Sequence, residues 1–377
     1  MECKYQTICG GCPLRYMEEN VYRQNKLDEF SKIVSAIWQK EIAVGSPIFI
    51  ADGLRRRAEF TFQYKKNNLQ LGFNMAQSHD IADIDYCVSL SLQINKIIPK
   101  LKLFLAELCK IKNTFKVKNK IHTSIIDSGE MWVTQAANGL DILLETKQKI
   151  NLEHRMLICE FVNSCSDIIR FSFGAKNKQP ETIIEKNKPY INVYNHKVFI
   201  AAGTFLQASN EGQQALIDLV LKYIGNTCGN IADLFCGIGT FSYPLSDNIK
   251  NKITAVDSSA ELLSGFQQTV NFLTIPNIKI VNKNLFKYPL DGDEIKNFEI
   301  IVFDPPRAGA AAQVKQIASV DRADKPQKII AISCNPHTFV NDANVLLNGG
   351  YYLKEITLVD QFVFSKHFEL VALFEKI

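Results

Sequence analysis

Beyond residue 203, apolar runs of strand length alternate with stretches of helical periodicity. The first helical stretch, residues 209–224, carries its apolar residues on one face and has Ser209 or Asn210 available as N-cap. This alternation is the signature of a parallel, doubly wound sheet. Five apolar runs predict its strands, namely residues 231–235, 252–257, 278–282, 298–304 and 328–333.

The N-terminal part of the chain has a different pattern. Residues 53–64 alternate between apolar and polar, residues 65–68 (KKNN) predict a turn, and residues 69–73 predict the returning strand. Residues 89–110 show helical spacing. From about residue 115 onwards, short strands joined by polar turns are predicted.

The change of pattern near residue 203 predicts a domain boundary. We expect a mixed α+β domain over residues 1–202 and an α/β domain over residues 203–377. Of the 377 residues, 46% are hydrophobic, so each domain has enough apolar side chains for a core of its own.

Composition limits the location and the partners of the chain. Lys and Arg number 43 and Asp and Glu 39, so the net charge of +4 does not by itself indicate a nucleic-acid binder. No apolar run has the length of a transmembrane helix, and the N-terminal residues lack the apolar stretch of a signal peptide. We expect a cytoplasmic protein with no membrane partner and no obligate protein partner. Its ten cysteines are then core residues, metal ligands or nucleophiles.

The glycine-rich turn after the first predicted strand is a candidate cofactor site. Gly237 and Gly239 permit a tight turn and close approach of a ligand to the backbone. Asp257 ends the next strand, where a carboxylate can accept hydrogen bonds from ribose hydroxyls. Ser242 breaks the G-x-G-x-x-G pattern of NAD-binding proteins. The D-x-F-x-G-x-G form, which includes Phe235, resembles that of class I S-adenosylmethionine (SAM) methyltransferases; the alternative is a plain sheet turn.

A second motif, Asp304-Pro305-Pro306-Arg307, follows the fourth predicted strand. Amino-methyltransferases have a similar D/N-P-P segment followed by an aromatic residue, and they use it to grip the target amine. Arg307 stands in place of that aromatic residue, which argues against an exocyclic amine as the target. For the two prolines, a rigid exit from the strand is the alternative.

Cys334 directly follows the fifth predicted strand, which stops abruptly before Pro336. Ligands of doubly wound sheets bind beyond the carboxyl ends of the strands, so we expect Cys334 at the same edge as the glycine turn and Asp304. A thiolate there can act as a nucleophile in covalent catalysis, and Glu369 or His367 can serve as the base. The alternative for Cys334 is a buried core thiol.

Four other cysteines form a candidate metal site. Cys3, Cys9 and Cys12 are closely spaced near the start of the chain, and Cys87 follows at a distance. Four thiolates suit an iron–sulfur cluster or zinc, and the remaining alternative is a set of unrelated thiols. The spacing differs from the C-x3-C-x2-C of radical-SAM enzymes, which disfavours a radical mechanism.

Together these motifs resemble those of the RNA uracil-5-methyltransferases, and the resemblance covers nearly the whole chain. The family patterns F-x-Q-x-N, D-x-F-C-G-x-G-x-F, D/N-P-P-R-x-G, S-C-N and D-M-F-P-x-T-x-H-x-E fall at residues 205–210, 233–241, 304–309, 333–335 and 360–369. The first pattern has one extra residue before Asn210. In the last pattern Gln361, Val363 and Ser365 replace Met, Pro and Thr.

The resemblance implies a Rossmann-like, SAM-dependent domain that methylates C5 of a uridine in RNA. It implies Cys334 as the nucleophile that adds to C6 of uracil and Glu369 as the base that removes the C5 proton. Of the cofactor residues, Asp257 would contact the SAM ribose. The implied cofactor-binding residues are Gln207, Phe235, Gly237, Gly239, Asp257 and Asp304.

The resemblance also implies a [4Fe-4S] cluster on Cys3, Cys9, Cys12 and Cys87, as in the rRNA-directed members. Within the family, the chain is most similar to members that methylate the uridine at position 747 of bacterial 23S rRNA. Cys3 lies so near the start that we expect no additional N-terminal RNA-binding barrel. The alternatives are a tRNA T-loop methyltransferase and a non-enzymatic iron–sulfur RNA-binding protein on a methyltransferase fold.

The segment Arg55-Arg56-Arg57 is a candidate RNA contact in the N-terminal domain. On a strand, Arg55 and Arg57 point to one face and Arg56 to the other. Contact with phosphates is the functional interpretation, and a solvated strand face is the alternative. The alternating Phe60, Phe62 and Tyr64 favour core packing over base stacking.

Overall fold

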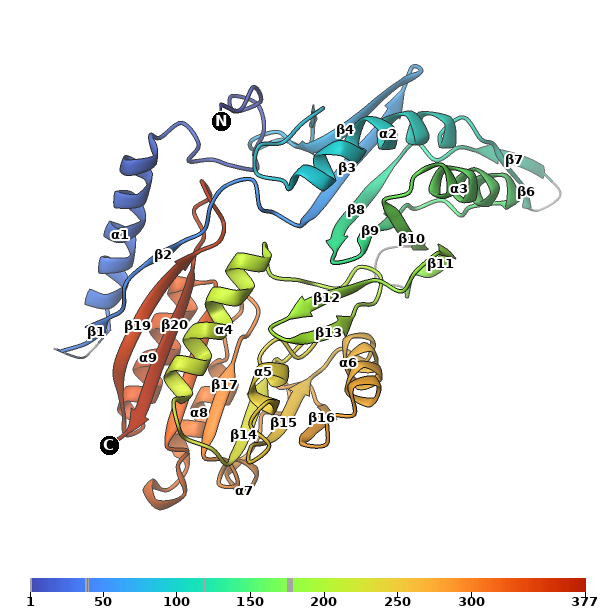
Figure 1. The fold of residues 1–377 in the computed structure, drawn as a ribbon. Helices are drawn as coiled ribbons and strands as arrows, with labels where there is room; N and C mark the ends of the chain where they lie inside the picture. The colour runs from blue at the N-terminus through green and yellow to red at the C-terminus, as the bar shows by residue number, and fades with distance from the viewer. Residues whose placement is uncertain (1, 38, 40, 118–119, 175–178) are drawn as a thin grey trace. The chain divides into compact units, whose positions relative to one another are not determined.

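The computed structural model describes residues 2–37, 39, 41–117, 120–174 and 179–377. The chain forms two compact units (Figure 1). The first unit consists of Met1–Tyr16, Ala51–Ile191 and Ile200–Ser209, and the second unit consists of Met17–Ile50, Asn192–Phe199 and Asn210–Ile377. The chain therefore passes between the units several times, whereas the sequence predicted a single boundary after residue 202.

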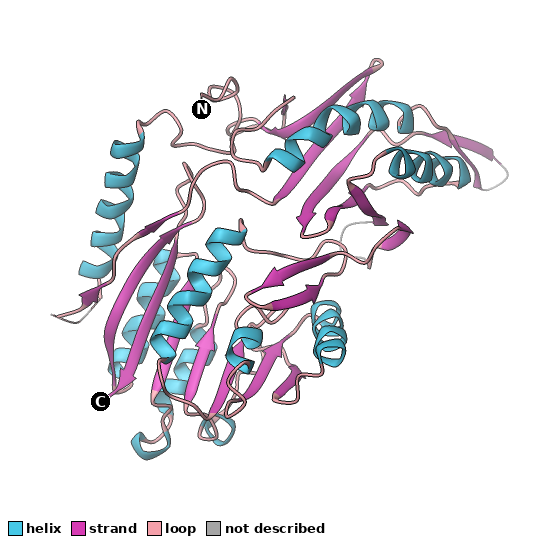
Figure 2. Ribbon diagram, in the orientation of Figure 1, coloured by secondary structure: helices cyan, strands magenta, loops and turns pink. Residues whose placement is uncertain are grey.

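The second unit is built on a nine-stranded sheet (Figure 2). The strand order is β1-β19-β20-β18-β17-β14-β15-β16, and β2 also pairs with β19. Strands β14 to β18 pair in parallel, whereas β20 is antiparallel to both β18 and β19. These strands are β1 (Ala43–Val44), β2 (Ile48–Phe49), β14 (Asn230–Leu234), β15 (Lys252–Asp257), β16 (Ile278–Asn282), β17 (Ile300–Phe303), β18 (Lys328–Ser333), β19 (Tyr351–Asp360) and β20 (Glu369–Lys376).

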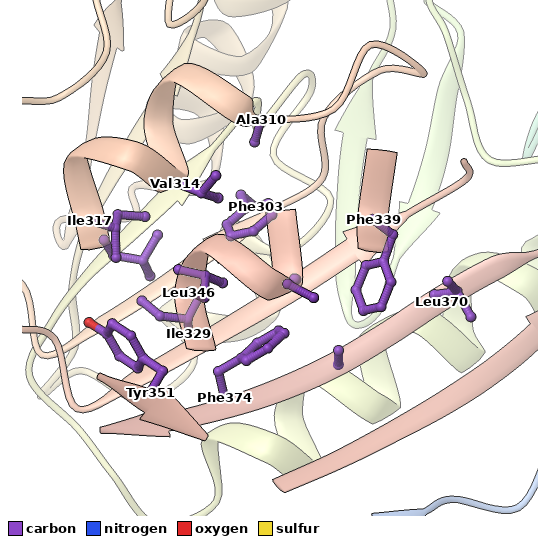
Figure 3. Close-up of a cluster of buried hydrophobic side chains, with 14 of the residues drawn as sticks. Phe303, Ala310, Val314, Ile317, Ile329, Phe339, Leu346, Tyr351, Leu370 and Phe374 are labelled. Carbon is purple, nitrogen blue, oxygen red and sulfur yellow. The ribbon is translucent and has the colours of Figure 1, made fainter. Parts of the chain in front are cut away.

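Helices cover both faces of this sheet. The helices are α1 (Glu19–Ser35), α4 (Asn210–Ile224), α5 (Ser242–Ser246), α6 (Ala260–Leu273), α7 (Gly292–Ile295), α8 (Ala311–Ser319) and α9 (Pro336–Asn348), with the 3₁₀ turn η1 (Arg322–Asp324). Side chains of α8 and α9 meet those of the central strands in one buried cluster (Figure 3). Leu370 and Phe374 of β20 belong to that cluster. Val371 and Leu373 point to the opposite face and are buried as well, so β20 is covered on both sides.

The sheet topology brings several chain segments to one edge. Because β14, β15, β17 and β18 are parallel, their carboxyl ends meet at the same edge. Because β20 is antiparallel to β18, it begins at this edge, and Leu370 pairs with Ser333. Glu369 therefore lies beside the end of the strand that leads into Cys334. The predicted doubly wound α/β fold is confirmed.

The first unit contains a seven-stranded sheet in the order β11-β10-β9-β8-β3-β4-β5. Its strands are β3 (Arg57–Lys65), β4 (Asn68–Asn74), β5 (Ile81–Asp83), β8 (Ser128–Ala136), β9 (Gly139–Glu145), β10 (Ile168–Gly174) and β11 (Glu181–Glu185). Helices α2 (Leu92–Leu108) and α3 (Leu152–Ser164) pack on it. A separate strand pair of this unit is β6 (Asn113–Val117) with β7 (Lys120–Ser124). Another pair, β12 (Tyr190–Val193) with β13 (His196–Phe199), falls where the chain passes into the second unit.

The predicted KKNN hairpin is present in the first unit. Lys66 and Asn67 both have positive φ, at 51° and 63°, as a two-residue turn between twisted strands requires. Phe60 and Phe62 are buried in the core of this unit, which agrees with the packing interpretation. Among the described residues, no helix is long and apolar enough to cross a membrane.

Candidate active site

The glycine turn after β14 adopts backbone conformations that depend on glycine. Gly237 and Gly239 have φ of 54° and 88°, in the left-handed region, and Phe235 shares it at 59°. A Cβ on Gly239 would lie 2.4 Å from the ring of Phe266, so this position admits no side chain. A Cβ on Gly237 would meet nothing within 4 Å. The backbone at Gly237 is thus open to a ligand, as the predicted cofactor site requires.

Asp257 lies at the end of β15 and is oriented by two backbone amides. The N–H of Gly237 donates to Oδ2 at 3.0 Å, and the N–H of Ser259 donates to Oδ1 at 2.9 Å. Each carboxylate oxygen retains a further lone pair. The residue therefore joins the glycine turn to its neighbouring strand and can still accept hydrogen bonds from a pair of ribose hydroxyls.

Asp233 is a buried carboxyl that the sequence analysis did not single out. It is fully buried, and the hydroxyl of Ser242 donates to its Oδ2 at 2.5 Å. Its Oδ1 has no hydrogen-bond partner among the described residues. Burial, assisted by the charges of Asp304 and Asp257, raises the pKa of Asp233 to about 7. Only its position inside the glycine motif could have drawn attention to it.

Cys334 stands at a sharp strand-to-helix turn. Asn335 caps helix α9 by accepting from the N–H of His337, and Pro336 is the first helical residue. The side-chain amide of Asn335 also donates to the backbone carbonyl of Arg307 at 2.8 Å, which links this turn to the D-P-P-R segment. The abrupt end of the strand thus holds a half-buried thiol at the edge of the sheet.

The thiol of Cys334 belongs to a cluster of charged groups. Burial is the main cause that raises its pKa to about 11, and the carboxylates of Glu369 and Asp304 add to the effect. The guanidinium of Arg307 opposes them. The pairing of Ser333 with Leu370 and the hydrogen bond between Asn335 and Arg307 bring together segments of the three separate motifs.

Glu369 is only 4% exposed and lies at the first position of β20. The Nε2 of Gln361 donates to its Oε1 at 3.2 Å, and its Oε2 has no hydrogen-bond partner among the described residues. Burial first, and then the charge of Asp304, raise the pKa of Glu369 to about 8. Such a carboxylate accepts a proton readily near neutral pH. His367, the alternative base, is exposed.

Gln207 lies in the first unit. Its side chain is buried, and its backbone carbonyl accepts a hydrogen bond from the Nε of Arg56 at 3.0 Å. Arg56 is 2% exposed, so this guanidinium serves the interior of the first unit, and its predicted phosphate contact is wrong. The role of Gln207 at the cofactor stays a prediction.

The four predicted metal ligands lie in one neighbourhood of the first unit. Burial is the main cause that raises the pKa of Cys9, and the charges of Cys12 and Cys3 add to it. Burial and the charges of Cys12 and Cys9 likewise raise the pKa of Cys87 to about 11. In the part of the chain that the structure describes, however, no three His, Cys, Asp or Glu side chains are arranged to hold a metal ion. The residue types fit four-thiolate ligation, whereas their present arrangement does not.

Comparison with known proteins agrees with the motifs. Residues 21–377 match the family described as tRNA (Uracil-5-)-methyltransferase. An uncharacterized RNA methyltransferase of Mesorhizobium japonicum is 32% identical over 375 residues, which cover 99% of this chain and 84% of that protein. The 23S rRNA (uracil(1939)-C(5))-methyltransferase RlmD of Mannheimia succiniciproducens is 26% identical, covering 100% of this chain and 81% of that protein.

Among solved structures, the tRNA (uracil-54, C5)-methyltransferase of Pyrococcus abyssi in complex with S-adenosyl-L-homocysteine is similar in fold. The TM-score is 0.74 at 21% identity, and the match covers 97% of this chain and 86% of that chain. The second unit thus has the fold of a SAM-dependent methyltransferase. With its motifs, its fold and a match over residues 21–377, the chain belongs to the tRNA (uracil-5-)-methyltransferase family.

Proposed function

We propose that this protein methylates C5 of one uridine in 23S rRNA, with SAM as the methyl donor, through a covalent bond between Cys334 and C6 of uracil. The observation that carries the proposal is the sheet edge where Ser333 pairs with Leu370, so that Cys334 lies beside the buried Glu369, with Asp304 at the end of the neighbouring strand β17. We expect the reaction in the cytoplasm. The 23S target, uridine 747, rests only on the sequence resemblance to family members that methylate that uridine.

In the proposed mechanism, bound SAM supplies an electrophilic methyl group. C5 of uracil is a poor nucleophile until the thiolate of Cys334 adds to C6 and gives C5 enolate character. The methyl group is then transferred to C5. Glu369 removes the C5 proton, the C5–C6 double bond forms again, and the bond between Sγ and C6 breaks to release the thiolate.

The protein's own residues support each of these steps. Asp257, Gly237 and the rest of the glycine turn hold the donor. Arg307 partly offsets the two carboxylates that disfavour the thiolate of Cys334. The raised pKa of Glu369 suits a group that must take up a proton from carbon and then pass it to solvent.

We further propose that Cys3, Cys9, Cys12 and Cys87 bind a [4Fe-4S] cluster in the first unit. The mutual electrostatic effects of these thiols support the proposal. Because the thiols are not in ligand geometry, binding requires them to move closer together. Iron and sulfide analysis of protein purified without oxygen tests this, and a zinc-loaded, colourless protein would contradict it.

A tRNA is the second candidate substrate, because the family description and the Pyrococcus abyssi structure both name tRNA. Methyl transfer from labelled SAM to unmodified 23S rRNA and to unmodified tRNA, with the modified nucleoside mapped, distinguishes the two. We expect 5-methyluridine in a single loop of 23S rRNA. Labelling of tRNA alone would retain the chemistry and overturn the substrate, and labelling of neither RNA would overturn the proposed function.

A further inference from the structure

A buried polar network in the second unit joins helix α1 to the segment that leads into Glu369. Lys26, at 1% exposure, places its Nζ 3.5 Å from Oδ1 of Asp360. The same Nζ donates to the carbonyl of His367 at 2.6 Å. The hydroxyl of Tyr22 donates to Oδ2 of Asp360 at 2.5 Å. One lysine therefore contacts the last residue of β19 and the end of the segment that leads into β20.

Burying this ion pair costs desolvation free energy, so the network is a poor means of stabilising the position of helix α1. Burial lowers the pKa of Lys26 and raises the pKa of Asp360, although each charge favours the ionised form of the other. Apolar residues of similar size usually stabilise a core at least as well as a buried ion pair does. Helix α1 already has such residues, since Phe30 and Ile33 lie in the main core. The polar contacts therefore call for a reason other than stability.

The network lies next to Glu369 and to Gln361, the residue that orients it. Asp360 is followed directly by Gln361, the residue whose amide donates to Oε1 of Glu369. At the other end, His367 is two residues before Glu369, and Lys26 also lies over the ring of Phe368, 5.2 Å from its centroid. Lys26 thus contacts the residue that precedes the orienting amide and the backbone two residues before the base.

Helix α1 also packs against the middle of this segment. Between Asp360 and Glu369 the chain has no regular secondary structure, and Phe364 has a positive φ of 58°. The ring of Phe364 packs against Tyr22 of α1 at 4.7 Å between centroids. Helix α1 therefore contacts the start, the middle and the end of the segment.

We propose that Lys26 is a positioning residue for the catalytic base: by binding Asp360 and the carbonyl of His367, it holds Glu369 where the C5 proton must be removed. The inference rests on the proposed function. Without Lys26, addition of Cys334 and methyl transfer proceed, but proton removal and release of the thiolate become slow. A misplacement of a catalytic group by about 1 Å can lower a rate about 100-fold.

The test compares Lys26→Met with the wild-type protein in two assays. We expect kcat to fall about 10- to 100-fold with KM nearly unchanged, because RNA and SAM binding are not touched. We also expect the covalent protein–RNA adduct that carries the labelled methyl group to accumulate on denaturing gels, as it should with Glu369→Gln. A structural defect would instead lower adduct and product together.

Matched variants make the outcome decisive. Lys32→Met, on the same helix but with its side chain 71% exposed, should behave as the wild type. Tyr22→Phe removes one hydroxyl from the network and should raise the adduct fraction to a smaller extent, so it decides the question if Lys26→Met does not fold. A normal adduct fraction in folded Lys26→Met or in Tyr22→Phe would overturn the inference. Failure of the wild-type protein to methylate uridine would instead overturn the proposed function.

Discussion

Replacing Glu369 by glutamine should stabilise the fold at alkaline pH while it blocks release of the product. In the native protein this carboxyl is buried, receives one hydrogen bond from Gln361 and lies near the charge of Asp304. Glutamine has nearly the same shape and can still accept from Gln361, but it never ionises. The substitution therefore removes the cost of a buried negative charge.

The magnitude follows from the pKa of Glu369, which rises from an ordinary value of 4.5 to about 8. At about 1.4 kcal/mol for each tenfold change in proton affinity, ionisation of Glu369 destabilises the native state by up to about 5 kcal/mol. Because the pKa is raised in the folded state, the contribution of this carboxyl to the free energy of unfolding is fully present below pH 4.5. It is lost as the pH rises through about 8. The advantage of Glu369→Gln should thus be small at pH 5 and near its full value at pH 9.

Urea unfolding of the wild-type and variant proteins at pH 5 and pH 9, followed by circular dichroism, measures this difference. Glu261→Gln, which changes the same charge at an exposed position of α6, is the control and should show little change at either pH. A free-energy difference between Glu369→Gln and wild type that is equal at the two pH values would refute the reasoning about burial.

Three further predictions concern the same edge of the sheet. Gln361→Leu removes the hydrogen bond that favours ionised Glu369, so the pKa of Glu369 rises and the rising limb of the pH–rate profile should move to higher pH. Gly239→Ala places a Cβ against Phe266 and forces a left-handed φ on alanine; unfolding measurements should show a loss of about 2–4 kcal/mol. Asp257→Ala loses both backbone hydrogen bonds and the predicted ribose contact, and calorimetry should show SAM binding weaker by about 10- to 100-fold.

The sequence was most informative where local pattern and topology agree. The alternation of apolar runs and helices predicted the parallel strands, and the strand ends then placed Asp257, Asp304 and Cys334 at one edge. The position of Glu369 could not follow from pattern alone. It depends on β20 being antiparallel to β18, which the sequence analysis did not predict.

Other features depend on contacts between residues far apart in the chain. Residues 17–50 belong to the second unit because β1 and β2 pair with β19, more than 300 positions away, and two-residue strands leave no readable pattern. From the sequence alone, Lys26 would be expected on the exposed face of its helix, because its buried partner Asp360 lies far away in the chain. The raised pKa of Asp233 likewise results mainly from burial in the folded protein, with the charges of Asp304 and Asp257 adding to it.

The most direct test of the covalent mechanism is to trap and map the bond between protein and RNA. In RNA that contains 5-fluorouridine, C5 carries fluorine in place of the proton, so Glu369 has nothing to remove and the thiolate cannot leave. After incubation with SAM and this RNA, peptide mass spectrometry should find a methylated fluorouridine attached to Cys334. The adduct should be absent in Cys334→Ala. An adduct on another cysteine, or methyl transfer to uridine by Cys334→Ala, would contradict the account.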